Sequence, residues 1–315
     1  MAGPTLLIGG MGFIGLHTAR RFLDAGQDVV LTYHQHRREP DFLAADVGAR
    51  AQVEQLDVLD SARVTDVIQR HGVEGVVYLV VPSLQGVSPA DEFQTNTQGY
   101  LNVLEASRAT GVRRLTVTSS VAIYSNVAER PWHEDAAVST VSTNPTEAYK
   151  KALEVLGLYF GRRTGLDVVM LRIAGIFGPL YHSMSNLPSR LVHAAAHARP
   201  PDFSGMRAGP PKAGDGGDVC YVKDSALGIQ LVHAAPTLRH RIYNVGSGQA
   251  TRNADLVSAI REVVPEFHAE LLPGGDADNR YMDLSRISTE LGYQPEFGVE
   301  RGLAEYVDWV RTHPQ

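Results

Sequence analysis

The sequence lacks several features that would place it in particular protein classes. Its longest unbroken apolar run, Val76 to Val81, is far short of the ~20 residues that cross a bilayer, so no membrane segment is expected. Cys220 is the only cysteine, which excludes an intrachain disulfide and a cysteine-based zinc cluster. The N-terminus lacks the basic and apolar regions of a signal peptide, and we expect a reducing cytoplasm as the location.

An excess of basic residues is also missing. The 29 basic and 35 acidic side chains give a formal net charge of −6, whereas a protein that binds nucleic-acid backbones carries a basic surplus. The composition is that of an ordinary globular protein, with 315 residues of which 43% are hydrophobic and 20% charged. At roughly 150 residues per domain, this length predicts about two domains with a sizeable core.

The first half of the sequence alternates short, β-branched apolar runs with longer amphipathic stretches, which is the pattern of a parallel sheet covered by helices. Strands are predicted at Thr5 to Ile8, Val29 to Tyr33, Val53 to Asp57, Val76 to Val81, Leu115 to Ser119 and Val168 to Ile173. Helices are predicted from Gly12 onward, and over Ser61 to Arg70, Phe93 to Thr110 and Thr146 to Arg163. A glycine that tolerates positive φ follows each helix: Gly26, Gly72, Gly111 and Gly165.

The regularity ends near Gly178. Residues 199–218 are dense in proline and glycine, which predicts a surface loop. Beyond the loop we expect a short strand, a helix, a strand from Arg241 to Val245, and helices near Asp255 to Val264 and Glu300 to Arg311. This second region is expected to form a small α/β unit interleaved with the sheet domain.

A glycine-rich loop joins the first predicted strand to the first predicted helix. Its glycines, Gly9, Gly12 and Gly15, have the spacing G-x-x-G-x-x-G. Gly9 permits a tight turn, Gly12 lets the backbone approach a pyrophosphate, and Gly15 lets the helix pack on the strand, while the helix start presents N–H groups to the anion. A glycine-rich turn without a ligand is the alternative, but the position within a series of βα units favours dinucleotide binding.

The end of the second strand bears on the choice of cofactor. A site selective for NAD usually has a carboxylate there, but Tyr33 and His34 occupy the position, and Arg37 and Arg38 follow. NADP is therefore slightly favoured over NAD, with a solvated pair of arginines as the alternative. Asp57, at the expected end of the third strand, is a candidate acceptor for the adenine amino group or an ordinary turn aspartate.

Taken together, the motifs resemble the extended short-chain dehydrogenase/reductases of the NAD-dependent epimerase/dehydratase type over essentially the whole chain. They are the glycine loop, Leu56-Asp57-Val58, Asn96, Thr118 to Tyr124, Leu171-Arg172 to Phe177-Gly178-Pro179, Tyr221 to Asp224, Tyr243 to Gly248 and Leu291 to Pro295. The resemblance implies cofactor contacts from Phe13, Ile14, Val58, Asn96, Lys150 and Ile176.

The resemblance also implies an α/β fold. We expect a Rossmann-type, doubly wound parallel sheet with a smaller α/β C-terminal substrate-binding domain. The dinucleotide-binding domain is expected to cover residues 1–176 with about 218–246, and the substrate-binding cap residues 177–217 and 247–315. A homodimer is expected by resemblance, through the helices at Phe93 to Thr110 and Thr146 to Arg163.

Catalysis in this family uses a serine or threonine together with Y-x-x-x-K on a helix, because residues i and i+4 share a helix face and the lysine lowers the pKa of the phenol. Ser120 matches the hydroxyl that binds the substrate oxygen, and Lys150 matches the lysine. The residue four before Lys150 is Thr146, while Tyr149 directly precedes the lysine. A threonine hydroxyl does not ionise near neutral pH, so it cannot replace the phenol in proton transfer.

Three explanations follow for the missing tyrosine. The helix start is distorted so that Tyr149 reaches the site; Tyr124, His182 or Glu147 relays the proton; or the protein binds a dinucleotide without the family's chemistry. The first two describe an NAD(P)-dependent oxidoreductase or epimerase that acts on a hydroxyl or carbonyl carbon of a small or sugar-like substrate. The third describes a sensor or regulatory protein.

Clues to ligands other than the dinucleotide are mostly negative. Gly217 stands where sugar-nucleotide enzymes of this kind typically carry an arginine, and Arg280 is a candidate anion contact or a surface residue. His34 and His36 lack carboxylate or cysteine partners in the sequence, so no metal is expected. The expected partners are a small-molecule substrate and a second copy of the chain.

Overall fold

The computed structural model describes residues 3–38, 40–81, 88–206 and 209–313. Its main element is a seven-stranded sheet in the order β10-β6-β5-β4-β1-β2-β3. The strands are β1 (Thr5–Ile8), β2 (Val29–Tyr33), β3 (Ala51–Gln55), β4 (Gly75–Tyr78), β5 (Arg114–Ser120), β6 (Asp167–Ile173) and β10 (Ile242–Val245). The pairs from β5 to β3 are all parallel, as the apolar runs predicted.

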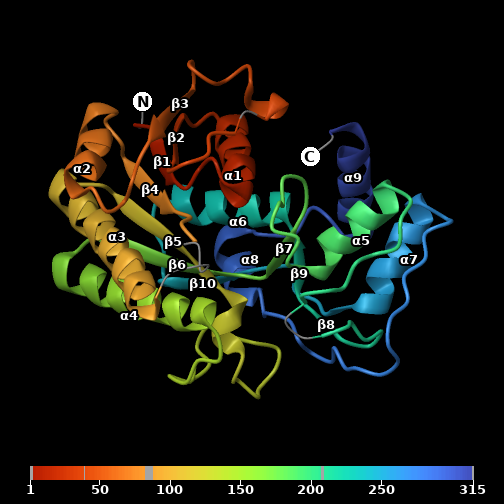
Figure 1. The fold of residues 1–315 in the computed structure, drawn as a ribbon. Helices are drawn as coiled ribbons and strands as arrows, with labels where there is room; N and C mark the ends of the chain where they lie inside the picture. The colour runs from red at the N-terminus through yellow and green to blue at the C-terminus, as the bar shows by residue number, and fades with distance from the viewer. Residues whose placement is uncertain (1–2, 39, 82–87, 207–208, 314–315) are drawn as a thin grey trace. The chain divides into compact units, whose positions relative to one another are not determined.

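Helices cover the sheet (Figure 1). They are α1 (Phe13–Asp24), α2 (Ser61–Arg70), α3 (Pro89–Thr110), α4 (Pro145–Thr164) and α6 (Val222–Ala234). Strand order reverses between β1 and β4, which makes the ends of these strands the switch point where doubly wound sheets bind ligands. The glycine loop follows β1 and therefore lies at this point.

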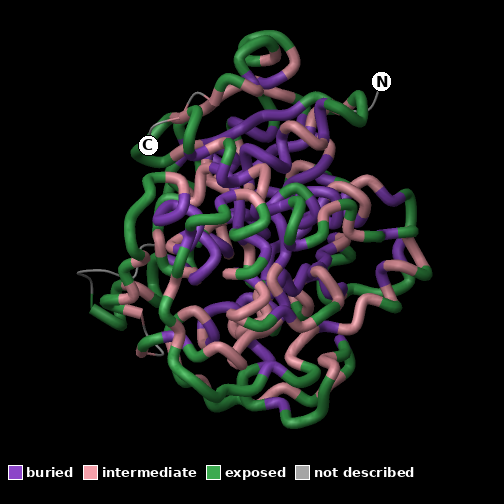
Figure 2. The backbone as a smooth tube through the Cα atoms, turned by 90° about the vertical axis from the view of Figure 1, so that its right-hand side faces the viewer, coloured by how far each residue is buried: buried purple, intermediate pink, exposed green. Residues whose placement is uncertain are grey.

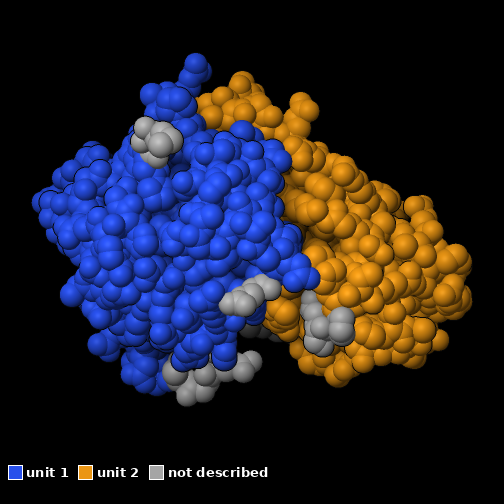
Figure 3. All heavy atoms as spheres, turned by 90° about the horizontal axis from the view of Figure 1, so that it is seen from above, with its two compact units in different colours: residues 1–127, 137–172, 226–243 blue, residues 128–136, 173–225, 244–315 orange. Residues whose placement is uncertain are grey.

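The chain forms two compact units, coloured separately in Figure 3. Unit 1 comprises residues 1–127, 137–172 and 226–243, and its apolar core lies between the strands and the helices α2, α3 and α4. Unit 2 comprises residues 128–136, 173–225 and 244–315. The buried backbone of the core is the purple tube in Figure 2.

Unit 2 combines short strand pairs with helices. β7 (Gly175–Phe177) pairs in parallel with β9 (Val219–Tyr221), and β8 (Gly216–Gly217) pairs antiparallel with β11 (Thr251–Arg252). The helices are α5 (Leu187–Ala196), α7 (Asn253–Val263), α8 (Ser285–Leu291) and α9 (Val299–Thr312). α5, α7 and α9 pack around their own apolar cluster. The roles of the expected domains, whose boundaries differ by several residues from those of the units, stay predictions.

Several predicted boundaries were wrong. β3 covers Ala51–Gln55 instead of ending at Asp57, because its register against β2 ends at the pair Tyr33 and Gln55. β4 ends at Tyr78, the partner of Ile8 in β1, and Val81 is 60% exposed. α3 begins at Pro89, four residues before the expected Phe93, because the Ser88 side chain accepts a hydrogen bond from the Asp91 N–H.

Two helices were missed in the sequence. α5 begins at Leu187 despite Pro188, because proline is tolerated in the first turn and Asn186 caps the helix through the Ser189 N–H at 2.9 Å. α8 has only seven residues, too few to show helical periodicity. The described part of residues 199–218 contains no helix, as expected, although Gly216–Gly217 forms β8. Gly26, Gly72, Gly111 and Gly165 have positive φ, which confirms the predicted helix ends.

Candidate active site

The glycine loop is held against the second strand by Thr32. The Gly9 N–H donates to Thr32 Oγ1 at 3.0 Å, and the Met11 N–H donates to the Thr32 carbonyl at 3.1 Å. Gly9 has a φ of +80°, which favours glycine. A Cβ on Gly15 would lie 2.5 Å from the carbonyl oxygen of Gly10, so this position requires glycine for close packing. The sequence argument missed Thr32, whose signal was a polar residue within an apolar strand.

Gly12 leaves the start of α1 open. It is the N-cap of the helix with a φ of −82°, and no side chain caps the first turn. A Cβ at Gly12 would meet only the Gly9 carbonyl oxygen, at 3.1 Å. The first turn also contains no acidic residue, so its positive end is not neutralised from within the helix. These features fit a bound pyrophosphate, with half-buried Phe13 and Ile14 at the same helix start.

The far end of β2 opens into a hollow of about 670 Å³, lined by His34, Gln35, Gln55, Asp57, Asp60 and Arg63. Asp57 Oδ1 accepts the Leu59 N–H at 2.9 Å, as in a turn, while its Oδ2 lies 3.7 Å from His34 Nε2. The Val58 carbonyl accepts a hydrogen bond from the Asn102 side chain at 2.9 Å. α3 therefore holds this segment in place, and Tyr33 is half-buried at the end of β2.

The two arginines expected near a 2′-phosphate do not line this hollow. Arg37 is exposed and Arg38 is half-buried. Burial lowers the pKa of the Arg38 guanidinium. Arg63, which does line the hollow, is paired with Glu54 at 3.0 Å and with Asp66 at 2.7 Å. Asp57 and Asp60 line the same hollow.

Ser120 is the last residue of β5, and the Lys150 side chain contacts the same end of this strand. Lys150 is 3% exposed, and its Nζ donates to the Thr118 carbonyl at 2.6 Å, two residues before Ser120. Burial lowers the pKa of Lys150 to about 8, while the nearby Glu154 carboxylate acts to raise it. The half-buried Ser120 ends β5, and its Oγ accepts the Ala122 N–H at 3.1 Å. Lys150 thus contacts β5 two residues before Ser120, and the catalytic roles of the two residues stay predictions.

The Tyr149 side chain is buried and its hydroxyl is already hydrogen-bonded, which does not suit a role in proton transfer. It is 3% exposed, and its hydroxyl donates to the Asn96 carbonyl at 3.3 Å. Burial raises the pKa of Tyr149 to about 12. α4 starts regularly at Pro145, with the Asn144 side chain accepting the Glu147 N–H at 3.0 Å, so the helix start is not distorted. Half-buried Thr146 lies one turn before Lys150.

The proposed relay residues of unit 1 are engaged elsewhere. The Tyr124 hydroxyl accepts a hydrogen bond from Arg172 at 2.8 Å, and the side chain is fully buried. Glu147 is buried and bonds Lys151 at 2.7 Å; burial alone would raise its pKa, but hydrogen bonds from Lys151, Ser125 and Thr143 lower it to about 2. A carboxylate with this pKa is not a proton donor at neutral pH.

The remaining predicted residues lie in both units. Asn96 is 4% exposed in the middle of α3, and its Nδ2 has no hydrogen-bond partner among the described residues. Ile176 belongs to unit 2, where its carbonyl accepts the Asn186 side chain at 2.7 Å. His182 also belongs to unit 2 and is exposed. In the described residues no group of three or more histidine, cysteine, aspartate or glutamate side chains could hold a metal ion.

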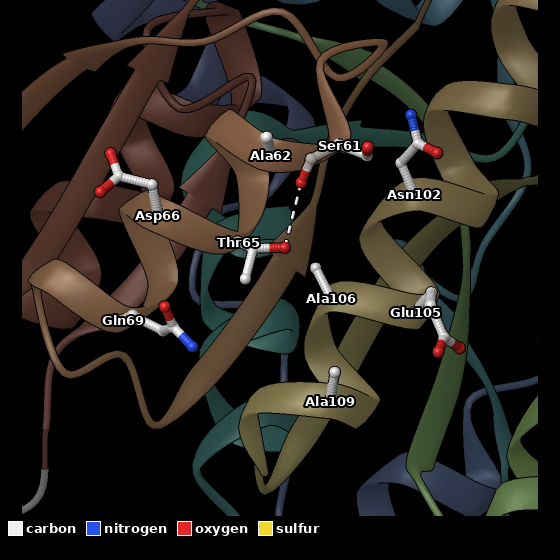
Figure 4. A pocket seen from close by; sticks show the side chains of 9 residues that line it. All are labelled: Ser61, Ala62, Thr65, Asp66, Gln69, Asn102, Glu105, Ala106 and Ala109. Carbon is white, nitrogen blue, oxygen red and sulfur yellow. Dashed lines mark hydrogen bonds between the residues drawn. The ribbon is translucent and has the colours of Figure 1, made fainter.

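A second hollow, of about 620 Å³, lies between α2 and α3 (Figure 4). Its lining is small or polar and contains none of the predicted site residues: Ser61, Ala62, Thr65, Asp66, Gln69, Asn102, Glu105, Ala106 and Ala109. Among the described residues, no helix is long and apolar enough to cross a membrane.

Comparison with known proteins places this site in a family. Residues 5–246 match the model of the NAD dependent epimerase/dehydratase family. A dTDP-glucose 4,6-dehydratase of Streptomyces griseus is 30% identical over 336 residues, which cover 99% of this chain and 95% of the relative. A UDP-glucose 4-epimerase of Lacticaseibacillus casei is 25% identical over 338 residues, with coverage of 98% and 97%.

Two solved structures of UDP-glucose 4-epimerases are similar to this chain in fold. The UDP-glucose 4-epimerase of Thermus thermophilus in complex with NAD has a TM-score of 0.78 at 25% identity and covers 98% of this chain and 99% of its own. The UDP-glucose 4-epimerase of Thermotoga maritima, solved with UDP-glucose, shares the fold with a TM-score of 0.81 at 22% identity, with coverage of 98% and 99%. The chain therefore belongs to the NAD-dependent epimerase/dehydratase family of extended short-chain dehydrogenase/reductases.

Proposed function

We propose that the protein is an NAD-dependent oxidoreductase or epimerase that acts on a hydroxyl- or carbonyl-bearing carbon of a sugar-nucleotide-like substrate. The observation that carries this proposal is buried Lys150, whose Nζ is anchored 2.6 Å from the Thr118 carbonyl beside Ser120. Burying an ammonium costs free energy, and the site provides no carboxylate at hydrogen-bonding distance in the described residues to offset it. Such a group is typical of a functional site.

Each residue has a role in this proposal. The bound cofactor would accept or supply a hydride at C4 of its nicotinamide. The open first turn of α1 with Gly12 holds the pyrophosphate, and Asp57 accepts from the adenine amino group. Lys150 holds the nicotinamide ribose, and Ser120 orients the substrate oxygen. Thr146 contributes a hydroxyl that hydrogen-bonds the substrate but does not ionise.

We propose NAD as the cofactor. The comparisons with NAD-bound relatives give no support for the preference for NADP that Arg37 and Arg38 suggested. The carboxylates of Asp57 and Asp60 in the hollow beyond β2 would repel a 2′-phosphate.

A sensor that binds the dinucleotide without turnover is the second candidate. Its support is that Thr146 occupies the position of the phenol, while the hydroxyls of Tyr149 and Tyr124 are engaged in the core. Both candidates use the same fold, so only a measurement of chemistry separates them.

The test combines binding with turnover. Calorimetry with NAD⁺, NADH, NADP⁺ and NADPH should show that NAD(H) binds. UDP-glucose and dTDP-glucose, followed by NMR for 4-epimers and keto products, and aldehydes and ketones, followed by NADH oxidation, should then reveal a reaction. Binding without any reaction would favour the sensor, and the absence of binding by all four dinucleotides would refute both candidates.

We also propose a homodimer through α3 and α4. Three large apolar side chains on these helices are exposed: Phe93 at 43%, Val155 at 69% and Tyr159 at 61%. Val155 and Tyr159 are four residues apart on α4 and so share one face of the helix, and exposed apolar side chains on a shared face are typical of an interface. A cytoplasmic location stays a prediction.

A further inference from the structure

A buried arginine connects the turn that carries Ser120 with the helix that carries Lys150. Arg172, near the end of β6, donates from Nε and Nη2 to the two carboxylate oxygens of Glu154 at 3.1 and 2.8 Å. Its Nη1 donates to the Tyr124 hydroxyl at 2.8 Å, and its guanidinium carbon lies 4.9 Å from the centre of the Tyr124 ring. Arg172, Glu154 and Tyr124 are 3%, 6% and 0% exposed.

Both partners of Arg172 are adjacent to proposed site residues. Tyr124 ends the 3₁₀ turn η2 (Val121–Tyr124), which starts directly after Ser120. Glu154 lies four residues after Lys150 on α4, so the two side chains share a helix face. A single guanidinium therefore links the turn after Ser120 to the helix that carries Lys150.

Glu154 also acts on the charge of Lys150. Its carboxylate favours the protonated lysine against the opposing effect of burial. In the part of the chain that the structure describes, the Lys150 ammonium also contacts two uncharged groups: the Thr118 carbonyl at 2.6 Å and the Tyr149 ring, whose centre is 5.8 Å from Nζ. A threonine hydroxyl does not ionise near neutral pH. Thr146 therefore cannot supply the negative charge that an ionised tyrosine at this position would place next to Lys150.

Burying the charges of Arg172 and Glu154 costs free energy, so we expect this ion pair to have a specific role. A buried ion pair gains little over well-packed apolar side chains, because both ions lose their hydration, and its best supported use is to fix one arrangement. The bidentate geometry of Arg172 and Glu154 adds this directional control.

We propose that Arg172 and Glu154 are positioning residues of the candidate active site. They fix Ser120 relative to Lys150, and Glu154 places a carboxylate one helical turn after Lys150 on the same face of α4. This inference rests on the proposed function for its consequence in cofactor binding. Its two structural parts are measurable in the protein without cofactor.

The first experiment follows Lys150 directly. The chain has four lysines, Lys150, Lys151, Lys212 and Lys223, so ¹³C-lysine labelling gives a simple NMR spectrum in which Lys150→Arg identifies the signal. Glu154→Gln is expected to lower the titration midpoint of Lys150 by about one pH unit. Glu147→Gln is the matched control, because it removes another buried carboxylate of α4 whose partner is Lys151, and it should leave the midpoint in place.

The second experiment follows the turn. Arg172→Lys keeps the charge but cannot bridge Glu154 and Tyr124 with the same fork of donors. Hydrogen exchange of the backbone amides in Val121–Tyr124 should become about tenfold faster in Arg172→Lys and in Tyr124→Phe. Exchange in α2 should not change.

The third experiment tests whether the protonation state of Lys150 affects the binding of the cofactor. NAD⁺ affinity of the wild type, measured by calorimetry between pH 6.5 and 9.5, should fall as Lys150 deprotonates, and Glu154→Gln should move this fall to lower pH. A Lys150 midpoint that Glu154→Gln does not move, or unchanged exchange in η2, would overturn the positioning role even if the variants unfold at lower temperature. Failure of the wild type to bind NAD⁺ at any pH would instead refute the proposed function.

Discussion

Single residues decide whether the glycine loop can hold a cofactor, and Gly12 gives the clearest test. Its φ of −82° suits any residue, so Gly12→Val should fold. The added side chain occupies the space proposed for the pyrophosphate, and NAD⁺ affinity should fall by about tenfold or more, as calorimetry would measure.

Gly298 provides a matched control for this change. It is the N-cap of α9 with a φ of −71°, and an added Cβ would lie 3.1 Å from the Glu300 carboxylate, whereas at Gly12 it would lie 3.1 Å from the backbone carbonyl of Gly9. Because the Glu300 side chain can move aside, Gly298→Val should cost no more stability than Gly12→Val and should leave NAD⁺ binding unchanged. Equal affinities of the two variants would mean that the loop does not bind the pyrophosphate.

Thr146 gives the most direct test of the proposed chemistry. A phenol at this position would lie one turn before Lys150, whose charge lowers its pKa. Thr146→Tyr should raise the rate of any hydride transfer by about 10²-fold, measured as single-turnover absorbance change at 340 nm. Tyr149→Phe should cost little, and Lys150→Ala should reduce both turnover and NAD⁺ affinity.

The opposite pattern would have a definite meaning. If Tyr149→Phe abolished activity while Thr146→Tyr had no effect, Tyr149 would be the proton donor despite its bond to the Asn96 carbonyl. Bound cofactor without turnover in every variant would favour a sensor.

Arg37 and Arg38 test the choice of cofactor. If NAD is the cofactor, Arg37→Ala with Arg38→Ala should leave NAD⁺ affinity within about twofold and should not create or remove a preference, measured by calorimetry with both dinucleotides. A selective loss of NADP⁺ binding in the double variant would restore the assignment that the sequence pattern suggested.

At the scale of elements, the start of α4 depends on a buried carboxylate. Glu147 accepts the Thr143 N–H and hydroxyl, each at 3.0 Å, and the Lys151 ammonium at 2.7 Å. Its pKa is lowered from the ordinary 4.5 to about 2 in the folded protein, because these hydrogen bonds outweigh burial. A lowered pKa stabilises the folded state fully above pH 4.5, and this contribution disappears as the pH falls through 4.5 toward 2.

Glu147→Gln should consequently lower the free energy of unfolding at pH 7 by about 3 kcal/mol at most. The loss should shrink as the pH falls from 4.5 toward 2, as urea titrations at several pH values would show. Glu105→Gln, which breaks an exposed pair with Arg108 on α3, should lower the free energy of unfolding far less, because solvent screens that pair. Equal costs for the two variants would contradict the assigned role of Glu147.

At the scale of the whole molecule, the exposed apolar side chains of α3 and α4 predict a dimer. Val155→Glu with Tyr159→Glu should convert the dimer to the 34.2 kDa monomer, with unchanged circular dichroism, because both side chains are already exposed in the single chain. Light scattering at micromolar concentration measures the mass. A wild type that is monomeric there would reject the dimer.

The sequence by itself predicted most of the strands and helices of unit 1, although not all of their ends. Thr5–Ile8, Val29–Tyr33 and Ser61–Arg70 form the predicted strands and helix residue for residue, because hydrophobic periodicity and capping residues act locally. The glycine spacing likewise predicted the loop, since the positive φ of Gly9 and the crowding at Gly15 are properties of those positions.

The tertiary structure alone decided where strands end and what the side chains contact. β3 stops where β2 stops, and β4 stops where β1 stops although its other partner β5 continues to Ser120, which no local pattern encodes. Nothing in the sequence shows that the Tyr149 hydroxyl meets the Asn96 carbonyl, or that Arg172 joins Tyr124 to Glu154. These contacts link residues 18 to 53 positions apart, and such pairs meet only when separate strands and helices pack together.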